Sequence, residues 1–350
     1  GLDNGIVTTA VEISPGRFWV GMEQGKIHEI SNGAVNNWQP KSPLPNQRLK
    51  HAIKDSKGFI WVSTYGGLKK FDDMGKSLPY PHQNEIDEFT RYTFEDSKGN
   101  IWGATSRRGV YKIGSDGSFL HLTSKNGLTS NFILSIDEDK DGRIWVGTKN
   151  GICIIKNDQI ASTIQMQDGL PSNFVFDLYV DNSGLIWITT ELGLCMYDGK
   201  GFSAFTFPNI KTDAAIFDVV EDKKGYLWLS SGSGLVYVRK DELIKKAQEP
   251  SHKLYYRLFT KSDGLKSEKC VGAVKMLFDS QERLWVPTTA GMAIIQPNKI
   301  SYVPELTKPT IRQINTADTV FYAKQASTLP AGSGKRLEII FSCYDFTAAE

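Results

Sequence analysis

Arginine, lysine and tyrosine residues stand at several turns of this sequence where the surrounding pattern is otherwise regular. A guanidinium group forks onto the oxygens of a carboxylate or sulfate, and a tyrosine ring adds a flat apolar surface with a polar tip. A set of such side chains that converges on one surface can therefore bind a carboxylated or sulfated sugar. The alternative is that each is an ordinary solvated loop residue. The candidate ligand-binding residues are Arg48, Tyr65, Arg91, Arg107, Arg108, Lys149, Glu191 and Lys269.

The sequence contains no pattern typical of a metal site or of a nucleophilic active site. Its five histidines are isolated, with no Cys or His three or four residues away, so the spacing of zinc ligands is missing. No phosphate-binding loop, nucleophile elbow or zinc helix occurs. Cys153 and Cys195 each follow a tryptophan by eight residues, and we expect both to be buried small hydrophobic residues. We predict no catalytic residue, no metal and no cofactor.

The elements that position the candidate residues follow from a repeat of tryptophans. Successive members are separated by 42, 41, 43, 42, 41 and 57 residues, and each is followed within a few residues by a glycine. A period of this length built from short strands is typical of β-propeller blades. We expect an all-β fold, a seven-bladed β-propeller of four-stranded antiparallel blades over residues 1–304, with the tryptophans packed between blades. The repeat tryptophans are Trp19, Trp61, Trp102, Trp145, Trp187, Trp228 and Trp285.

The fourth repeat shows how one blade is built. Apolar and alternating segments predict strands at 132–136, 144–148, 152–155 and 160–166. Between the first two, Asp139 bonds the backbone two residues on and Gly142 accepts a positive φ, which makes a tight turn. The loops that lead into each blade and the turns between second and third strands then share one face, with the D-x-x-G turns on the other. All candidate ligand-binding residues fall on the first of these faces.

A propeller enzyme of lyase or lactonase type is the main alternative, with a metal or a His/Glu cluster at the central channel. It predicts several His, Asp or Glu residues at one strand position in several blades. The inner strands offer only Asp177 and Asp218 at matching positions, and two carboxylates do not make a catalytic site. Their other inner positions are apolar, as at Ile53, Phe94, Ile133, Phe174 and Ile216.

Composition and one insertion complete the picture from the residues. A formal net charge of +2 argues against nucleic acid as a partner, and no run of about eighteen apolar residues predicts a membrane span in this segment. Twelve extra residues in the sixth repeat include 240–248, which we expect to form a short amphipathic helix on the D-x-x-G face.

The repeat D-x-x-G-x-(I/L)-W-(V/I)-G-T, preceded by D-G-L-x-S-N, resembles the two-component regulator propeller family, most specifically over residues 262–300. The resemblance implies the periplasmic, non-enzymatic sensor region of a hybrid two-component histidine kinase. Such a sensor detects an oligosaccharide, which the basic candidates suggest is acidic, and signals to a kinase outside this segment. The partners it implies are the ligand, the remainder of the receptor and a second copy of the chain. A third interpretation is a purely structural propeller, with the ligand bound elsewhere in the receptor.

The resemblance also interprets the last part of the chain. Residues 305–350 are expected to be a linker followed by the first strands of an immunoglobulin-like module, at 309–315 and 336–342. Roughly 45 residues do not bury the core of a sandwich, so this segment is an incomplete module.

Overall fold

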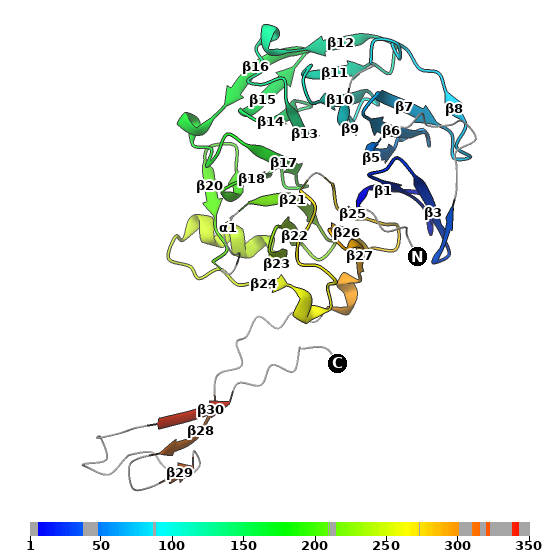
Figure 1. Ribbon diagram of the computed structural model, residues 1–350. Coiled ribbons are helices and arrows are strands. Elements are labelled where there is room, and N and C mark those ends of the chain that lie inside the picture. The colour runs from blue at the N-terminus through cyan, green and yellow to red at the C-terminus, as the bar shows by residue number, and fades with distance from the viewer. Residues whose placement is uncertain are drawn as a thin grey trace. The chain divides into compact units, whose positions relative to one another are not determined.

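The computed structural model describes residues 6–37, 48–86, 89–208, 210, 215–272, 274–300, 310–315, 320–322 and 338–342. The chain forms two compact units, Gly1–Pro297 and Asn298–Glu350. The first unit is a ring of seven antiparallel sheets, with the first strand of each sheet nearest the centre (Figure 1). Six sheets have four strands in sequence order, and the seventh has three among the described residues. The predicted seven-bladed β-propeller is therefore confirmed.

The blades are numbered in chain order. Blade 1 comprises β1 Val7–Ser14, β2 Arg17–Met22, β3 Ile27–Ser31 and β4 Ala34–Asn37. Blade 2 comprises β5 Leu49–Lys54, β6 Ile60–Thr64, β7 Gly67–Phe71 and β8 Ser77–Leu78. Blade 3 comprises β9 Thr90–Glu95, β10 Ile101–Thr105, β11 Val110–Ile113 and β12 Phe119–Leu122. Blades 4 and 5 comprise β13 Ile133–Glu138, β14 Ile144–Thr148, β15 Gly151–Lys156, β16 Gln159–Ile164; and β17 Val175–Val180, β18 Ile186–Thr190, β19 Gly193–Tyr197, β20 Phe202–Phe205. Blades 6 and 7 comprise β21 Ile216–Glu221, β22 Tyr226–Ser231, β23 Gly234–Arg239, β24 Tyr256–Phe259; and β25 Leu277–Phe278, β26 Leu284–Thr288, β27 Gly291–Ile295. Short 3₁₀ turns are η1 Ser124–Asn126, η2 Met166–Asp168, η3 Lys261–Asp263 and η4 Pro297–Lys299.

Blade 4 differs from its predicted strands by two residues at two ends and by one residue at four others. β13 extends to Glu138, because the D-x-x-G turn begins only at Asp139. β16 ends at Ile164, since the Asp168 carboxylate accepts a hydrogen bond of 2.8 Å from the Gln165 N–H and draws the next residues into η2. A fourth strand for blade 7, expected near 300–303, falls on 301–303, outside the described residues.

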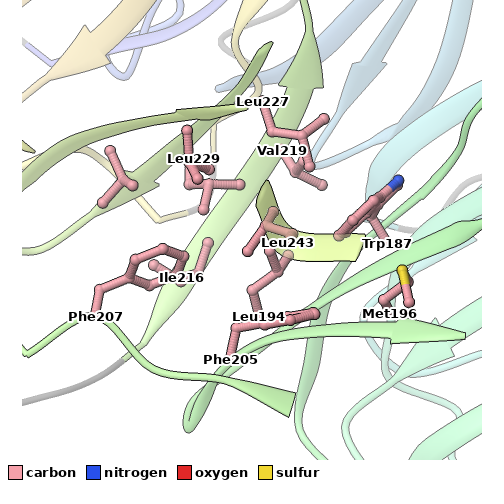
Figure 2. Packing of buried hydrophobic residues seen from close by; sticks show 12 residues of the cluster. Trp187, Leu194, Met196, Phe205, Phe207, Ile216, Val219, Leu227, Leu229 and Leu243 are labelled. Atoms are coloured by element: carbon pink, nitrogen blue, oxygen red, sulfur yellow. The ribbon is translucent and has the colours of Figure 1, made fainter. Parts of the chain in front are cut away.

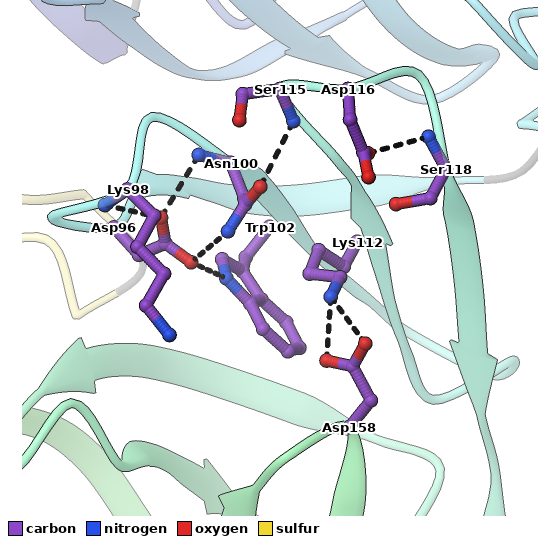
Figure 3. Close-up of polar contacts among 9 residues, drawn as sticks. All are labelled: Asp96, Lys98, Asn100, Trp102, Lys112, Ser115, Asp116, Ser118 and Asp158. Atoms are coloured by element: carbon purple, nitrogen blue, oxygen red, sulfur yellow. Dashed lines mark hydrogen bonds and ion pairs between the residues drawn. The ribbon is translucent and has the colours of Figure 1, made fainter.

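One hydrogen-bonded unit recurs in six blades and explains the spacing of aspartate and tryptophan. In blade 3, Asp96 Oδ1 accepts from the backbone of Lys98 and Asn100 at 3.0 and 2.9 Å, which closes the turn. Its Oδ2 accepts from the indole Nε1 of Trp102 at 2.8 Å (Figure 3). The same indole bond joins Trp61, Trp145, Trp187, Trp228 and Trp285 to the aspartate six residues earlier, at 2.6–3.1 Å. Burial of these indoles costs little free energy, because the single N–H donor of each has a hydrogen-bond partner.

The blades pack face to face through apolar side chains. Between blades 5 and 6, Trp187 and Phe205 meet Ile216 and Leu229 in one buried cluster (Figure 2). All seven repeat tryptophans are buried, with at most 3% of their surface exposed. They therefore cannot serve as stacking platforms for a sugar, and their contribution is burial of apolar area between sheets.

Among the described residues, the ring closes by packing, and no strand is exchanged between blades 1 and 7. Trp285 of blade 7 stacks on Phe18 of blade 1, with ring centroids 4.3 Å apart. On the D-x-x-G face, Glu12 of blade 1 accepts hydrogen bonds of 2.7 and 2.8 Å from Ser280 of blade 7. The same serine–glutamate contact joins blade 2 to blade 3 and blade 3 to blade 4. The seam between blades 7 and 1 thus repeats a contact made within the ring.

The predicted helix is α1, Lys240–Gln248. Its Lys240 N–H bonds the carbonyl of Gly225 in a D-x-x-G turn at 3.0 Å, which places the helix on the expected face. Leu243 is fully buried against blades 5 and 6. Among the described residues, no helix is long and apolar enough to cross a membrane.

The second unit contains a small antiparallel sheet. Its strands are β28 Thr310–Asn315, β29 Val320–Tyr322 and β30 Glu338–Ser342, in the order β29-β28-β30. Strands were expected at 309–315 and 336–342, close to β28 and β30. The assignment of this sheet to an immunoglobulin-like module stays a prediction.

Candidate ligand-binding site

The candidate residues lie on the face formed by the loops into each blade and the turns between second and third strands, here called the loop face. Backbone hydrogen bonds tie the two segments together within a blade, from Tyr65 to Arg48 at 3.3 Å and from Lys149 to Phe132 at 3.1 Å. Gly151 allows this turn, because it has a φ of 100° and a Cβ there would lie 2.4 Å from the carbonyl oxygen of Ile164.

Four of the candidates come together in a row that runs across blades 2, 3 and 4. The Tyr65 ring, 41% exposed, stacks on Phe89 with centroids 4.0 Å apart and an interplanar angle of 7°. Arg48 lies 5.7 Å from the Tyr65 ring, and Arg91 lies 5.6 Å from the Phe89 ring. The row is called the loop-face band and comprises Arg48, Lys50, Tyr65, Phe89, Arg91, Phe132 and Lys149.

Phe132 links the band to blade 4. Arg91 lies over its ring at 4.8 Å and Lys149 at 6.0 Å. The Lys50 ammonium lies 5.2 Å from the Tyr65 ring and 5.9 Å from the Phe89 ring. The band thus holds four cations, with Glu23 as an acidic neighbour 4.0 Å from Arg48. Cation–π contact leaves the N–H edges of each guanidinium available to a carboxylate. Burial lowers the pKa of Arg91, opposed by the nearby Tyr65. Sequence reasoning missed Lys50, Phe89 and Phe132, although both phenylalanines stand thirteen residues before the tryptophan of their blade.

The other candidates are not part of this band. Arg107 and Lys269 are exposed, and in the part of the chain that the structure describes neither forms a hydrogen bond, an ion pair or a cation–π contact with the band. Glu191 accepts a hydrogen bond of 2.7 Å from the Ser172 hydroxyl and so helps to fix a loop of blade 5. Arg108 lines a separate shallow pocket on blade 3, together with Glu85, Ile86, Thr105, Tyr111, Phe119 and His121.

A second group of polar side chains lies deeper, at the axis of the ring. Each blade contributes the residue ten positions before its tryptophan, as Asp177 precedes Trp187. The sequence argument against an enzyme compared the wrong positions. Ile53, Phe94 and Ile133 do not stand ten residues before a tryptophan, so they do not lie at the level of Asp177. The residues at this level are Thr9, His51, Tyr92, Ser135, Asp177, Asp218 and Lys275.

Five of these residues contact one another across the axis and are called the axial cluster: His51, Tyr92, Asp177, Asp218 and Lys275. The Lys275 ammonium pairs with Asp177 and, at 3.4 Å, with Asp218. It lies 5.3 Å from the Tyr92 ring, which packs on His51 with centroids 4.4 Å apart. Blades 2, 3, 5, 6 and 7 therefore meet at one ammonium group.

Burial sets the protonation of this cluster. Against the effect of burial, Asp177 and Asp218 raise the pKa of Lys275, which keeps it charged. Burial raises the pKa of Asp177 well above its ordinary value; Lys275 opposes this effect and Asp218 adds to it. Burial and the Lys275 charge lower the pKa of His51 to about 3, so the imidazole is neutral and a weak base.

Asp137 follows Ser135, the blade 4 residue at the level of the axial cluster, by two positions. Its titration predicts a pH dependence of the free energy of unfolding. Burial raises its pKa to about 6, although its carboxylate accepts hydrogen bonds from Val180 N–H at 2.7 Å and Glu138 N–H at 2.8 Å. Because the folded pKa exceeds the unfolded value, its contribution to stability is present below about pH 4 and is lost as pH rises through 6. Urea unfolding should show that wild type loses up to about 3 kcal/mol more than Asp137→Asn between pH 4 and 7. Parallel pH profiles for the two proteins would contradict this assignment.

A model of the two-component regulator propeller family matches residues 127–150 and 169–191, which hold the tryptophans of blades 4 and 5. The matched stretches carry the blade-leading loop, the D-x-x-G turn and the indole partner described above. The chain carries two-component regulator propeller repeats. No curated protein matches the chain significantly.

Solved structures share the fold of this propeller. The extracellular domain of the putative hybrid two-component system BT3049 from B. thetaiotaomicron is 22% identical with a TM-score of 0.72, over 97% of this chain and 44% of that one. The extracellular domain of the putative one-component system BT4673 from the same organism is 17% identical with a TM-score of 0.66, over 94% and 46%. Virginiamycin B lyase from Staphylococcus aureus is 14% identical with a TM-score of 0.63, over 83% and 94%. The chain thus spans less than half the length of the first two.

Among the described residues, no group of three or more His, Cys, Asp or Glu residues is placed to hold a metal ion. Cys153, Cys195 and Cys270 are free and buried, as expected for the first two, while Cys343 lies outside the described residues.

Proposed function

We propose that this propeller is the ligand-sensing, extracytoplasmic part of a two-component receptor, and that the loop-face band binds an acidic oligosaccharide. The kinase and the remainder of the receptor lie outside this segment. The family repeats and the likeness to an extracellular domain of a putative hybrid two-component system support the sensor role. The observation that carries the ligand class is the exposed Tyr65–Phe89 stack among four cations.

The chemistry of the band suits an acidic sugar. Aromatic faces pack against the apolar C–H face of a sugar ring, and guanidinium groups fork onto its carboxylate or sulfate. Arg48 keeps 57% of its side chain exposed and lies 4.0 Å from the Glu23 carboxylate, so this cation is only loosely paired. Surface ion pairs of this kind are weak and readily exchange for a better partner.

Binding rather than catalysis is proposed for the whole ring. The carboxylates of the axial cluster already pair with Lys275 or with backbone N–H groups, and the neutral His51 is a weak base. A general base near neutral pH would need a pKa close to 7. The fold likeness to a lyase does not carry an activity to this chain.

Tyr65→Ala tests the proposed ligand site. We expect wild type to bind acidic members of an array of short neutral, uronic-acid-containing and sulfated oligosaccharides, and the variant to bind them at least about tenfold more weakly. The reason is the loss of an exposed aromatic platform that packs nothing in the core. Isothermal titration calorimetry with the best array member gives the affinities.

Met74→Ala is the matched control. Met74 is also exposed, at 51%, and lies on blade 2 in the turn between β7 and β8, on the opposite face. Its affinity should equal that of wild type. If wild type binds no array member, or if Tyr65→Ala binds as tightly as Met74→Ala, the proposed site is wrong.

A further inference from the structure

The loop-face band and the axial cluster are successive layers of the same strands. Each innermost strand begins at the loop face and runs toward the D-x-x-G face. Its later residues therefore lie deeper along the axis of the ring. Lys50 directly precedes His51, and Arg91 directly precedes Tyr92. On the other side of the ring, Phe176 and Phe217 directly precede Asp177 and Asp218. The cluster therefore lies one residue below the upper layer of cations and phenylalanines.

A β-bulge separates the two layers. The pairing register shifts between Leu49 and His51 in β5, and likewise between Val175 and Asp177 in β17 and between Ile216 and Asp218 in β21. A bulge leaves one residue unpaired and re-aims the side chains around it, and bulges are common beside binding sites. Here it places two consecutive side chains of one strand on the path from the loop face to the axis.

The upper layer on blades 5 and 6 is aromatic. Phe176 packs on Phe174 with centroids 4.8 Å apart and meets Phe217 edge to face at 5.4 Å. All three rings are only partly buried. They stand opposite the cationic band of blades 2 to 4, so the surface above the axis is charged on one side and apolar on the other.

The cluster lies at the axis and is largely buried. The Lys275 side chain keeps 20% of its surface exposed, but its Nζ is buried, and Asp177 and Asp218 keep only 7% and 3%. Tyr92 and His51 are also only partly buried. Since Lys275 and Tyr92 come from opposite parts of the ring and meet at the axis, a chain cannot thread past them.

We infer that the axial cluster is a subsite that binds the terminal sugar residue of a ligand held end-on by the loop face. The Tyr92 phenol offers a donor to a terminal hydroxyl, and the carboxylates held in place by Lys275 offer acceptors. Phe176 and Phe217 would pack on the apolar face of the same sugar. The inference rests on the proposed function and adds which part of the ligand is recognised and where.

Two substitutions in the cluster test this subsite, with one matched control. Asp177→Asn removes the carboxylate charge but keeps an oxygen for the long 3.4 Å bond from Val219 N–H. Tyr92→Phe removes only the phenol hydroxyl. Asp137→Asn is the control, because it makes the same chemical change in a buried aspartate that bonds backbone N–H groups and forms no ion pair with Lys275 among the described contacts.

The measurement is calorimetric titration of each folded variant with the array oligosaccharide that wild type binds best, together with the same sugar methylated on its terminal residue. We expect Asp177→Asn and Tyr92→Phe to weaken binding by about tenfold or more, since a charged hydrogen bond is lost or its partner is left unpaired. Asp137→Asn should bind as wild type does. Terminal methylation should weaken wild-type binding to a similar degree.

The outcomes separate the subsite from the proposed function. If Tyr65→Ala loses binding while Asp177→Asn and Tyr92→Phe keep it, or if terminal methylation has no effect, the loop-face site stands and the axial subsite is wrong. If wild type binds no oligosaccharide, both are wrong. Should Asp177→Asn fail to fold, Tyr92→Phe and the methylated sugar still decide the question.

Discussion

Replacing Trp285 by alanine is expected to lower the free energy of unfolding by about 3–5 kcal/mol. The indole is 1% exposed, stacks on Phe18 across the seam and donates to Asp279 at 2.9 Å. Alanine leaves a cavity and an unpaired carboxylate oxygen in the place where the ring closes. Urea denaturation followed by circular dichroism measures the loss.

Trp187→Ala separates the seam from the core. Trp187 is also fully buried and bonded to its aspartate, but it lies between blades 5 and 6, which a turn of chain already connects. We expect a similar loss of stability from both variants. Only Trp285→Ala should make blades 1 and 7 the first sites of cleavage in limited proteolysis under native conditions, because no covalent link holds that interface. Identical cleavage patterns would show that the seam is no weaker than the other junctions.

Lys275→Met is expected to destabilise the propeller by about 3 kcal/mol at neutral pH, because it leaves two buried carboxylates without a counter-charge. Burial already raises the pKa of Asp177, and removal of the ammonium raises it further. A carboxyl with a raised folded pKa stabilises the fold in its protonated form and loses that contribution as pH increases. The defect should therefore be smaller at pH 5 than at pH 8, as measured by urea unfolding at both.

Lys269→Met controls for the loss of a positive charge from the same blade. Lys269 is exposed on the loop face, and its replacement should change stability by no more than about 0.5 kcal/mol. A Lys275→Met variant that loses the same stability at both pH values would mean that the two carboxylates do not depend on this ammonium.

The architecture could be predicted because its signals repeat. Six aspartates stand six residues before a tryptophan, and each pair makes the same bond, so turn, strand and buried ring could be assigned from one-dimensional spacing. The helix at 240–248 followed from the same logic, as an insertion into a known period. Local chemistry fixes these features, and local chemistry is visible in a sequence.

The axial cluster could not be predicted in the same way, because the residue types at its level differ in nearly every blade. Histidine, tyrosine, serine, aspartate and lysine share a position but no chemistry, so no motif recurs. Alignment of each strand on its tryptophan would have placed His51, Tyr92 and Lys275 beside the two aspartates. The loop-face band was also not predicted from the sequence. Phe89 and Phe132 contact residues of neighbouring blades only because the blades are arranged around a common axis.

The aspartate–tryptophan unit also bears on how such a ring can grow by gene duplication. A copied blade carries its own D-x-x-G turn and its own aspartate partner for the buried indole, so the copy already specifies its local shape. Only the two surfaces that face its neighbours must still be matched. Blade 1 has Ile13 where the others have aspartate, which shows that a copy can diverge at this position while its sheet is kept. Inheritance of a complete folding unit explains why the loop face and the axis were left free to diversify.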